Sequence, residues 1–162
     1  MNDRRWSAIL AGLGLVALLG CQERKQEYNG IGQYLIKKTK LVDGKVSFRC
    51  QPSGPKLSWC FGGPEVKIGE QPAAVSLYFA GQTDDAPLTE IALAIRGCDA
   101  EKAEKALTNA LGPASETKDK QLFWVKKAMF VSARLRLEGT TCDVSFVDPA
   151  DQTRVDELRA GK

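Results

Sequence analysis

Hydrophobic and polar residues alternate with the two-residue period of a β-strand in the middle of the chain. Residues 74–80 and 89–97 both show this period, and the turn-forming sequence GQTDDAP separates them. The positions expected to point inward are Val75, Leu77 and Phe79 in the first segment and Ile91, Leu93 and Ile95 in the second. The pattern predicts two antiparallel strands that bury one face.

A β-hairpin is expected before this pair. Residues 45–51 alternate, and residues 57–61 return after a Pro-Ser-Gly-Pro turn. One face of the first strand would carry Val46, Phe48 and Cys50. Residues 65–68 form a further short candidate strand. Residues 31–41 fit either a short amphipathic helix or an edge strand, and two early glycines weaken the helix.

The clearest helical pattern follows Asp99, which is a favourable N-cap residue. Glu101 lies in the first turn, where the helix dipole favours a negative charge, and Gly112-Pro113 ends the helix. The apolar positions with helical spacing are Ala103, Ala106, Leu107, Ala110 and Leu111. A short terminal helix is expected at 151–159.

Three more strands are expected after the first helix, at 121–125, 130–137 and 142–146. Strand pairs, one well-defined helix and a further antiparallel meander predict an α+β fold, with the helix packed on an antiparallel sheet. In its element order, the segment from Asp99 to Val147 resembles the helix-plus-meander units of the outer-membrane assembly lipoprotein BamE and of the β-lactamase-inhibitor protein. The resemblance implies a binding role by analogy of fold.

The first 20 residues have the arrangement of a secretory signal peptide. Arg4 and Arg5 precede the apolar run from Trp6 to Gly20. A helix of these 15 residues reaches about 22 Å, which is less than the roughly 30 Å hydrocarbon core of a bilayer. A permanent transmembrane helix is therefore the weaker interpretation.

The end of this run, Leu18-Leu19-Gly20-Cys21, resembles the lipobox of bacterial lipoproteins. The resemblance implies cleavage after Gly20, a diacylglyceryl group on Cys21 and subsequent N-acylation. Two or three acyl chains make a lasting anchor, since each buried methylene contributes about 0.8 kcal/mol. Gln22 stands where Asp would retain a lipoprotein in the inner membrane in the enterobacterial pattern. The implied location is the outer membrane, on its periplasmic face, with surface exposure left open.

The anchor divides the chain into three parts: a signal peptide (1–20), a lipidated tether (21–29) and a single α+β domain (30–162). The eight residues after Cys21 span at most about 26–29 Å. We therefore expect the folded domain to lie close to the bilayer.

Four cysteines remain once Cys21 is set apart, and they are Cys50, Cys60, Cys98 and Cys142. An even count in an exported chain indicates two disulfides, for which three pairings are possible. We favour Cys50–Cys60, which flanks a short turn-rich connector, and Cys98–Cys142, which lies at the ends of predicted elements. A zinc site is the weaker alternative, because the chain has no histidine and no C-x2-C pair.

Charge and composition exclude several function classes. The whole chain has a formal net charge of +3. Without residues 1–20 it has 21 Lys+Arg against 19 Asp+Glu, a balance that does not favour a nucleic-acid partner. The absence of histidine excludes Ser-His-Asp and Cys-His catalysis. We expect no catalytic residues, no cofactor and no metal.

Recognition is the remaining candidate chemistry, and the large aromatic residues are its candidate carriers. Trp59, beside the hairpin that Cys50–Cys60 would brace, and Tyr78 are the expected partner-binding residues. Two function classes follow. The first is a non-catalytic lipoprotein that binds a partner protein in the cell envelope. The second is an inhibitor or immunity-type lipoprotein that blocks a secreted or periplasmic enzyme with the loop QPSGPK at 51–56.

Overall fold

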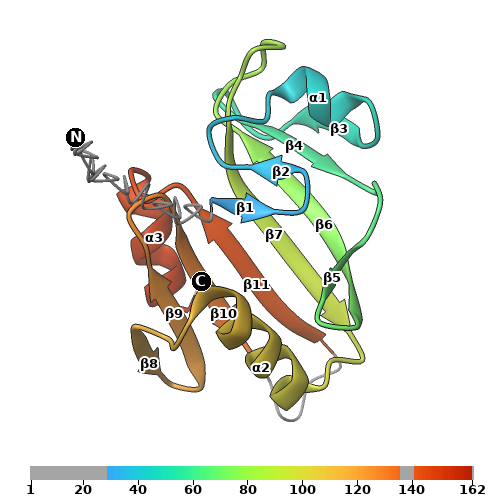
Figure 1. The fold of residues 1–162 in the computed structure, drawn as a ribbon. Coiled ribbons are helices and arrows are strands. Elements are labelled where there is room, and N and C mark those ends of the chain that lie inside the picture. The colour runs from blue at the N-terminus through green and yellow to red at the C-terminus, as the bar shows by residue number, and fades with distance from the viewer. Residues whose placement is uncertain (1–28, 136–140, 162) are drawn as a thin grey trace, which may run out of the picture.

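The computed structural model describes residues 29–135 and 141–161, and a nine-stranded antiparallel sheet dominates them (Figure 1). Its strands in spatial order are β3 (Arg49–Pro52), β4 (Ser58–Phe61), β6 (Gln71–Phe79), β7 (Leu88–Arg96), β11 (Thr141–Val147), β10 (Phe130–Arg134), β9 (Gln121–Val125) and β8 (Glu116–Lys118). The remaining strand, β5 (Val66–Ile68), pairs with the first residues of β6.

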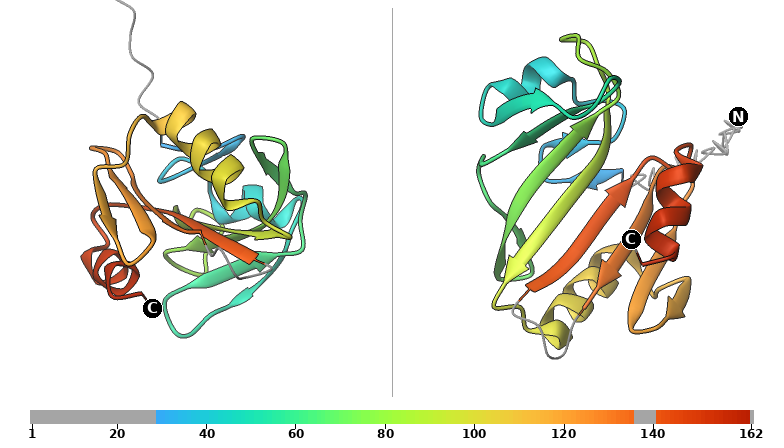
Figure 2. Two further views of the ribbon diagram at one scale, coloured as in Figure 1. Left: turned by 90° about the horizontal axis from the view of Figure 1, so that it is seen from below. Right: turned by 180° about the vertical axis from the view of Figure 1, so that it is seen from behind.

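Helices cover the two faces of this sheet unequally. The longest helix, α2 (Ala100–Leu111), lies on one face together with α1 (Leu41–Lys45) and a small hairpin of β1 (Gly30–Ile31) and β2 (Tyr34–Leu35) (Figure 1). The terminal helix α3 (Gln152–Arg159) lies on the other face (Figure 2). The prediction of a helix on an antiparallel sheet is thus confirmed in outline, although sheet outweighs helix.

Cross-strand register shows why the α2 side forms the main core. One row of side chains crosses six neighbouring strands in the order Cys60, Leu77, Ile91, Phe146, Val131 and Trp124. Each of these residues is at most 1% exposed. The buried face of α2 packs against the same cluster through Ala103, Leu107 and Leu111. The alternation in the sequence therefore predicted the inward face of β6 and β7 correctly.

The two disulfides have the favoured pairing. Cys50 and Cys60 are register partners in the β3–β4 hairpin, with a Cα–Cα distance of 4.0 Å. Cys98, just after β7, is bonded to Cys142 in β11, at a sequence separation of 44. The first bond closes a local hairpin, whereas the second ties the start of α2 to the centre of the sheet.

The strand expected at 45–51 is wrong in its first half. Residues 41–45 form α1, in which the Lys40 N–H donates to Asp43 Oδ2 at 2.8 Å, half of a capping box. The strand begins only at Arg49, and Val46 is 81% exposed instead of facing the core. Local capping therefore prevails over a weak alternating pattern. Residues 31–41 comprise the end of β1, the short strand β2, an irregular connection and the first residue of α1. They therefore form neither a single amphipathic helix nor a single edge strand.

The predicted signal peptide, the cleavage site at Gly20 and Cys21, and the tether up to residue 28 lie outside the described residues. Within the described part of the chain, no helix is both long enough and apolar enough to cross a membrane.

Candidate binding face of the sheet

The sheet face opposite α2 carries small residues at its centre. We call it the open face, and one of its rows runs Phe61, Ser76, Ala92, Ser145, Ser132 and Phe123. The four central residues of this row are serine or alanine on adjacent strands. Ala74 and Ala94 continue the small surface in the next row. These short side chains leave space above the central strands, and the larger residues at the two ends of the row border that space.

That space is a trough of about 300 Å³. Its floor includes Ala74, Ser76, Ala92 and Ser145, and α3 contributes Leu158 and Arg154 to one side. The volume is at the small end of the range for ligand pockets, which is about 300–1,000 Å³. The trough is therefore a shallow, open depression rather than an enclosed cavity.

A ridge of three aromatic rings stands on the open face beside the trough. Trp59 and Tyr78 are register partners on β4 and β6, with ring centroids 6.4 Å apart and planes within 13°. Phe61, two residues along β4, stacks on Trp59 with a centroid distance of 4.3 Å. All three residues are half-buried. The structure thus brings the two expected partner-binding residues together and adds Phe61 to them.

The ridge contains one buried polar atom without a partner. Trp59 Nε1 is buried and donates to no atom among the described residues. Buried Trp N–H groups usually have an acceptor.

On the other side of the trough, an ion pair fixes α3 to the sheet. Arg154 donates from Nε to Glu90 Oε2 at 2.8 Å and from Nη2 to Glu90 Oε1 at 3.0 Å, a bidentate geometry. Glu90 is only 6% exposed. Its hydrogen bonds raise the pKa of the Arg154 guanidinium. Burial, and then the charge of Glu90, raise the pKa of the Tyr78 hydroxyl.

Apolar contacts of α3 reinforce the ion pair. Val155 and Leu158 pack with Phe123, Phe130 and Val147 in a small cluster of their own. The helix therefore covers the β9–β10–β11 side of the open face and leaves its centre uncovered.

The polar groups of the trough are few. Gln121 Nε2 donates to Ser132 Oγ at 2.5 Å and to the Leu158 carbonyl at 3.1 Å, which orders the end near α3. Arg134 and Asp143 are register partners that also line the trough. Arg134 has no ion pair within the part of the chain that the structure describes. Besides Arg154, which is paired with Glu90, the trough thus offers one cation, Arg134, and one carboxylate, Asp143, around a neutral floor.

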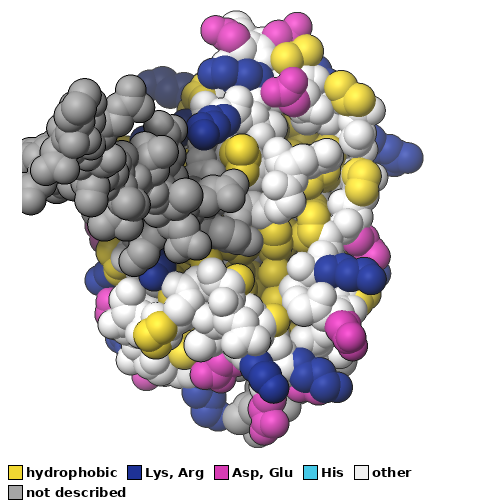
Figure 3. Space-filling view, viewed as in Figure 1, with side chains coloured by type: hydrophobic (Ala, Val, Ile, Leu, Met, Phe, Trp, Pro, Cys, Tyr) yellow, Lys and Arg dark blue, Asp and Glu magenta, His cyan; other side chains and the backbone are white. Residues whose placement is uncertain are grey.

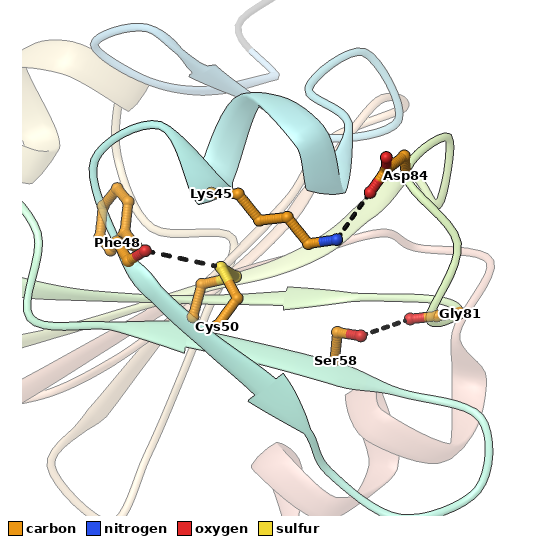
Figure 4. Close-up of a disulfide and its surroundings, with 7 residues drawn as sticks. Lys45, Phe48, Cys50, Ser58, Gly81 and Asp84 are labelled. Carbon is orange, nitrogen blue, oxygen red and sulfur yellow. Dashed lines mark hydrogen bonds and ion pairs between the residues drawn. A yellow bond between two sulfur atoms is a disulfide. The ribbon is translucent and has the colours of Figure 1, made fainter.

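The predicted loop at 51–56 lies outside the trough: its first two residues end β3, and the others belong to the connection from β3 to β4. Every residue of the loop is exposed, and Gly54 has φ +78°. The Gln82 side chain donates to the Gly54 carbonyl at 2.9 Å. Ser58 Oγ donates to the Gly81 carbonyl at 2.8 Å near the Cys50–Cys60 bond (Figure 4). The loop is therefore a projecting turn held at its base.

Two other large aromatic residues do not contribute accessible groups to this face. Phe123 and Trp124 are both fully buried, and Trp124 Nε1 donates to the Gly112 carbonyl at 2.8 Å. The small floor of the trough and the Glu90–Arg154 pair were not predicted. Serine and alanine at the outward positions of β6, β7 and β11 were the available signal for the floor.

No protein-family model, curated protein or solved structure matches this chain. Within residues 29–135 and 141–161, no group of three or more His, Cys, Asp or Glu side chains is arranged to hold a metal ion.

Proposed function

We propose that this protein is a non-catalytic bacterial lipoprotein that binds a partner protein of the cell envelope through its open face. The observation that carries the proposal is the aromatic ridge of Trp59, Phe61 and Tyr78 beside an uncovered trough. Aromatic residues are enriched among the residues that dominate binding energy at protein interfaces.

The lipobox resemblance supplies the location in this proposal. Cys21 carries the acyl chains, and Gln22 directs the protein to the outer membrane on its periplasmic face. A tether that spans at most about 26–29 Å keeps the open face close to that membrane. The partner is then a protein that is itself in or against the membrane.

Rigidity of the face supports binding to a protein. The Cys50–Cys60 bond lies under the strands that carry the ridge, and the Glu90–Arg154 pair holds α3 beside the trough. A preorganised surface loses little conformational entropy on association, so more of its contact energy appears as affinity. The small, mostly neutral floor allows close approach of a partner backbone or side chain.

Site-specific photocrosslinking tests this proposal. A benzoylphenylalanine at position 59 or 78 of the full chain is activated in intact cells, and the same residue at position 46 is the control. Val46 is 81% exposed and follows α1, on the α2 side of the sheet. We expect one envelope protein to crosslink at 59 and 78 but not at 46. Equal crosslinking at all three positions would contradict the proposal.

A matched pair of substitutions measures the energetic contribution of the trough. Ala74 and Ala80 are both exposed; Ala74 lies within β6 and Ala80 directly follows this strand, but only Ala74 lines the trough. We expect Ala74→Lys to lower recovery of the partner from detergent-solubilised membranes by about ten-fold, the effect of about 1.4 kcal/mol. Ala80→Lys is expected to leave recovery unchanged.

Inhibition of a secreted or periplasmic enzyme is the second candidate function. The exposed loop at 51–56, braced at its base by Cys50–Cys60 and by the hydrogen bond from Gln82, supports it. In this case a soluble hydrolase is captured, and Lys56→Glu abolishes capture whereas Ala74→Lys does not. The opposite result favours docking through the open face.

The anchor has its own test. Mass spectrometry of the mature protein is expected to find Cys21 as the acylated first residue, and Cys21→Ala is expected to accumulate as the uncleaved precursor. Normal processing and membrane retention of Cys21→Ala would refute the anchor. Gln22→Asp is expected to move the protein to the inner-membrane fraction.

A further inference from the structure

A second hollow lies on the α2 side of the sheet, between α2, the β1–β2 turn and the β5–β6 turn. Its volume is about 260 Å³. The large apolar residues that line it are Ile31, Ile68, Leu107, Leu111 and Phe146. Figure 3 shows hydrophobic side chains in a hollow of this face. We call this hollow the α2 groove.

Two glycine turns border the α2 groove without covering it. Gly32 and Gly69 both line it and have φ values of +56° and +62°, which favour glycine. A Cβ atom at Gly69 would lie 3.1 Å from Ala106 Cβ, so the β5–β6 turn packs directly against the helix. The groove is therefore closed at this turn by backbone and remains open above.

The lining of the groove is apolar with one charged side chain. Its five large apolar residues are each at most 8% exposed. Lys67 also lines the groove, is exposed, and has no ion pair among the described residues. An apolar trough with a lysine beside it is complementary to an anionic amphiphile, whose chain is buried while its head group meets the ammonium.

The volume restricts the occupant to a single chain. An apolar cavity of about 150 Å³ holds benzene, so 260 Å³ holds a longer apolar segment but not two parallel chains or a helix. The two acyl chains of a diacyl lipid are thus too large for the groove. A single acyl chain with one carboxylate fits both the volume of the groove and the charge of Lys67.

We propose that the α2 groove binds the acyl chain of a fatty acid, with the carboxylate at Lys67. The position of the groove supports a membrane source for this ligand. Ile31 lines it, in the strand that follows the tether directly, so the proposed anchor would hold the groove within reach of the bilayer. This last step rests on the proposed lipid anchor, whereas the fit of the groove does not.

The test is photolabelling of the full chain in isolated membranes with a fatty acid that carries a diazirine and an alkyne. After irradiation, peptide mapping locates the adduct. We expect labelling of the residues around Leu107 and Leu111 or around Ile68, competed by unlabelled dodecanoate. Labelling that is not competed, or that lies elsewhere in the chain, would overturn the proposal.

Substitution of Ala110 fills the groove. Ala110 is exposed and lines the groove, whereas Asn109 is exposed on the same helix and does not line it. We expect Ala110→Phe to lower labelling at least about ten-fold, the loss of roughly two buried methylene groups, and Asn109→Phe to leave it unchanged. Equal labelling of the two variants would refute the site.

Two more arms separate the possible causes of failure. Lys67→Gln is expected to weaken competition by dodecanoate about two- to five-fold at low salt, as for an exposed ion pair, and less at high salt. Cys21→Ala is expected to keep the groove labelling, because the dissolved probe reaches the groove without the anchor. If no partner crosslinks at positions 59 and 78 but the fatty acid still labels the α2 groove, only the proposed binding of a partner through the open face is refuted. Loss of partner recovery on Ala110→Phe, without loss of label, would assign the groove to a protein instead.

Discussion

The Glu90–Arg154 pair permits a quantitative prediction about the wall of the trough. Glu90 is 6% exposed and Arg154 is 30% exposed, and two hydrogen bonds join them. The substitution Arg154→Met keeps the aliphatic stem but leaves the carboxylate buried without its partner. The loss then combines a charge-assisted hydrogen-bonded pair with an uncompensated buried charge.

The magnitude follows from burial. Breaking a fully buried ion pair costs about 3–5 kcal/mol, and hydrogen bonds to charged groups contribute about 1.5–3 kcal/mol. Because Arg154 is partly solvated, water reaches the vacated site and reduces the penalty. We expect Arg154→Met to lower the free energy of unfolding by about 2–3 kcal/mol, with a Tm lower by about 5–10 °C.

A double-mutant cycle identifies the cause. Urea unfolding, followed by the fluorescence of buried Trp124, gives the stability of wild type, Arg154→Met, Glu90→Gln and the double variant. Removal of both charges leaves no buried charge, so the double variant is expected to recover at least about 1 kcal/mol relative to the sum of the single effects. A coupling energy below about 0.5 kcal/mol would refute the argument that the pair fixes α3.

Three other predictions concern separate parts of the fold. Replacement of both Cys98 and Cys142 by alanine is expected to cost about 4 kcal/mol in the urea assay, against about 2.7 kcal/mol for the shorter disulfide, because it closes the longer loop; a reversed order would contradict the loop-closure account. Because the folded pKa of Tyr78 is raised, its contribution to stability is fully present below about pH 10 and is lost as the pH rises through the folded pKa. Tyr78→Phe should therefore flatten the decline in stability above that pH, and ultraviolet titration of the phenolate checks it. Val46→Asp is expected to change the free energy of unfolding by less than about 0.5 kcal/mol, whereas a large loss would favour the strand expected from the sequence.

Features that depend on neighbouring residues could be predicted from the sequence, whereas features that depend on distant residues could not. The helix start was predictable because Asp99 caps it locally, with Oδ1 accepting from the Lys102 N–H at 3.1 Å. The disulfide pairing was predictable because Cys50 and Cys60 flank a short turn-rich connector, and Cys98 and Cys142 lie at the ends of predicted elements. The late start of β3 was not predictable. The alternation at 45–51 gives no sign of the preceding helix, which is capped through Asp43.

The candidate binding face depended on both levels. Trp59 and Tyr78 were identifiable as large aromatic residues near a braced hairpin, but their stacking follows from the pairing of β4 with β6. Trp124, an equally large residue by sequence, is fully buried because it occupies the core row rather than the open face. Residue type alone does not distinguish these two environments.

The period of the strands, the α2 helix, the cysteine pairs and the lipobox pattern could all be recognised without the structure, because each depends on residues close together in the chain or on a simple count. By contrast, the small residues of β6, β7, β11 and β10 form one row and a trough only because these four strands pair in this order and register. It also placed Arg154 against Glu90, 64 positions away in the chain. Such contacts depend on strand order and register, which arise from packing of the whole sheet and leave no local signal.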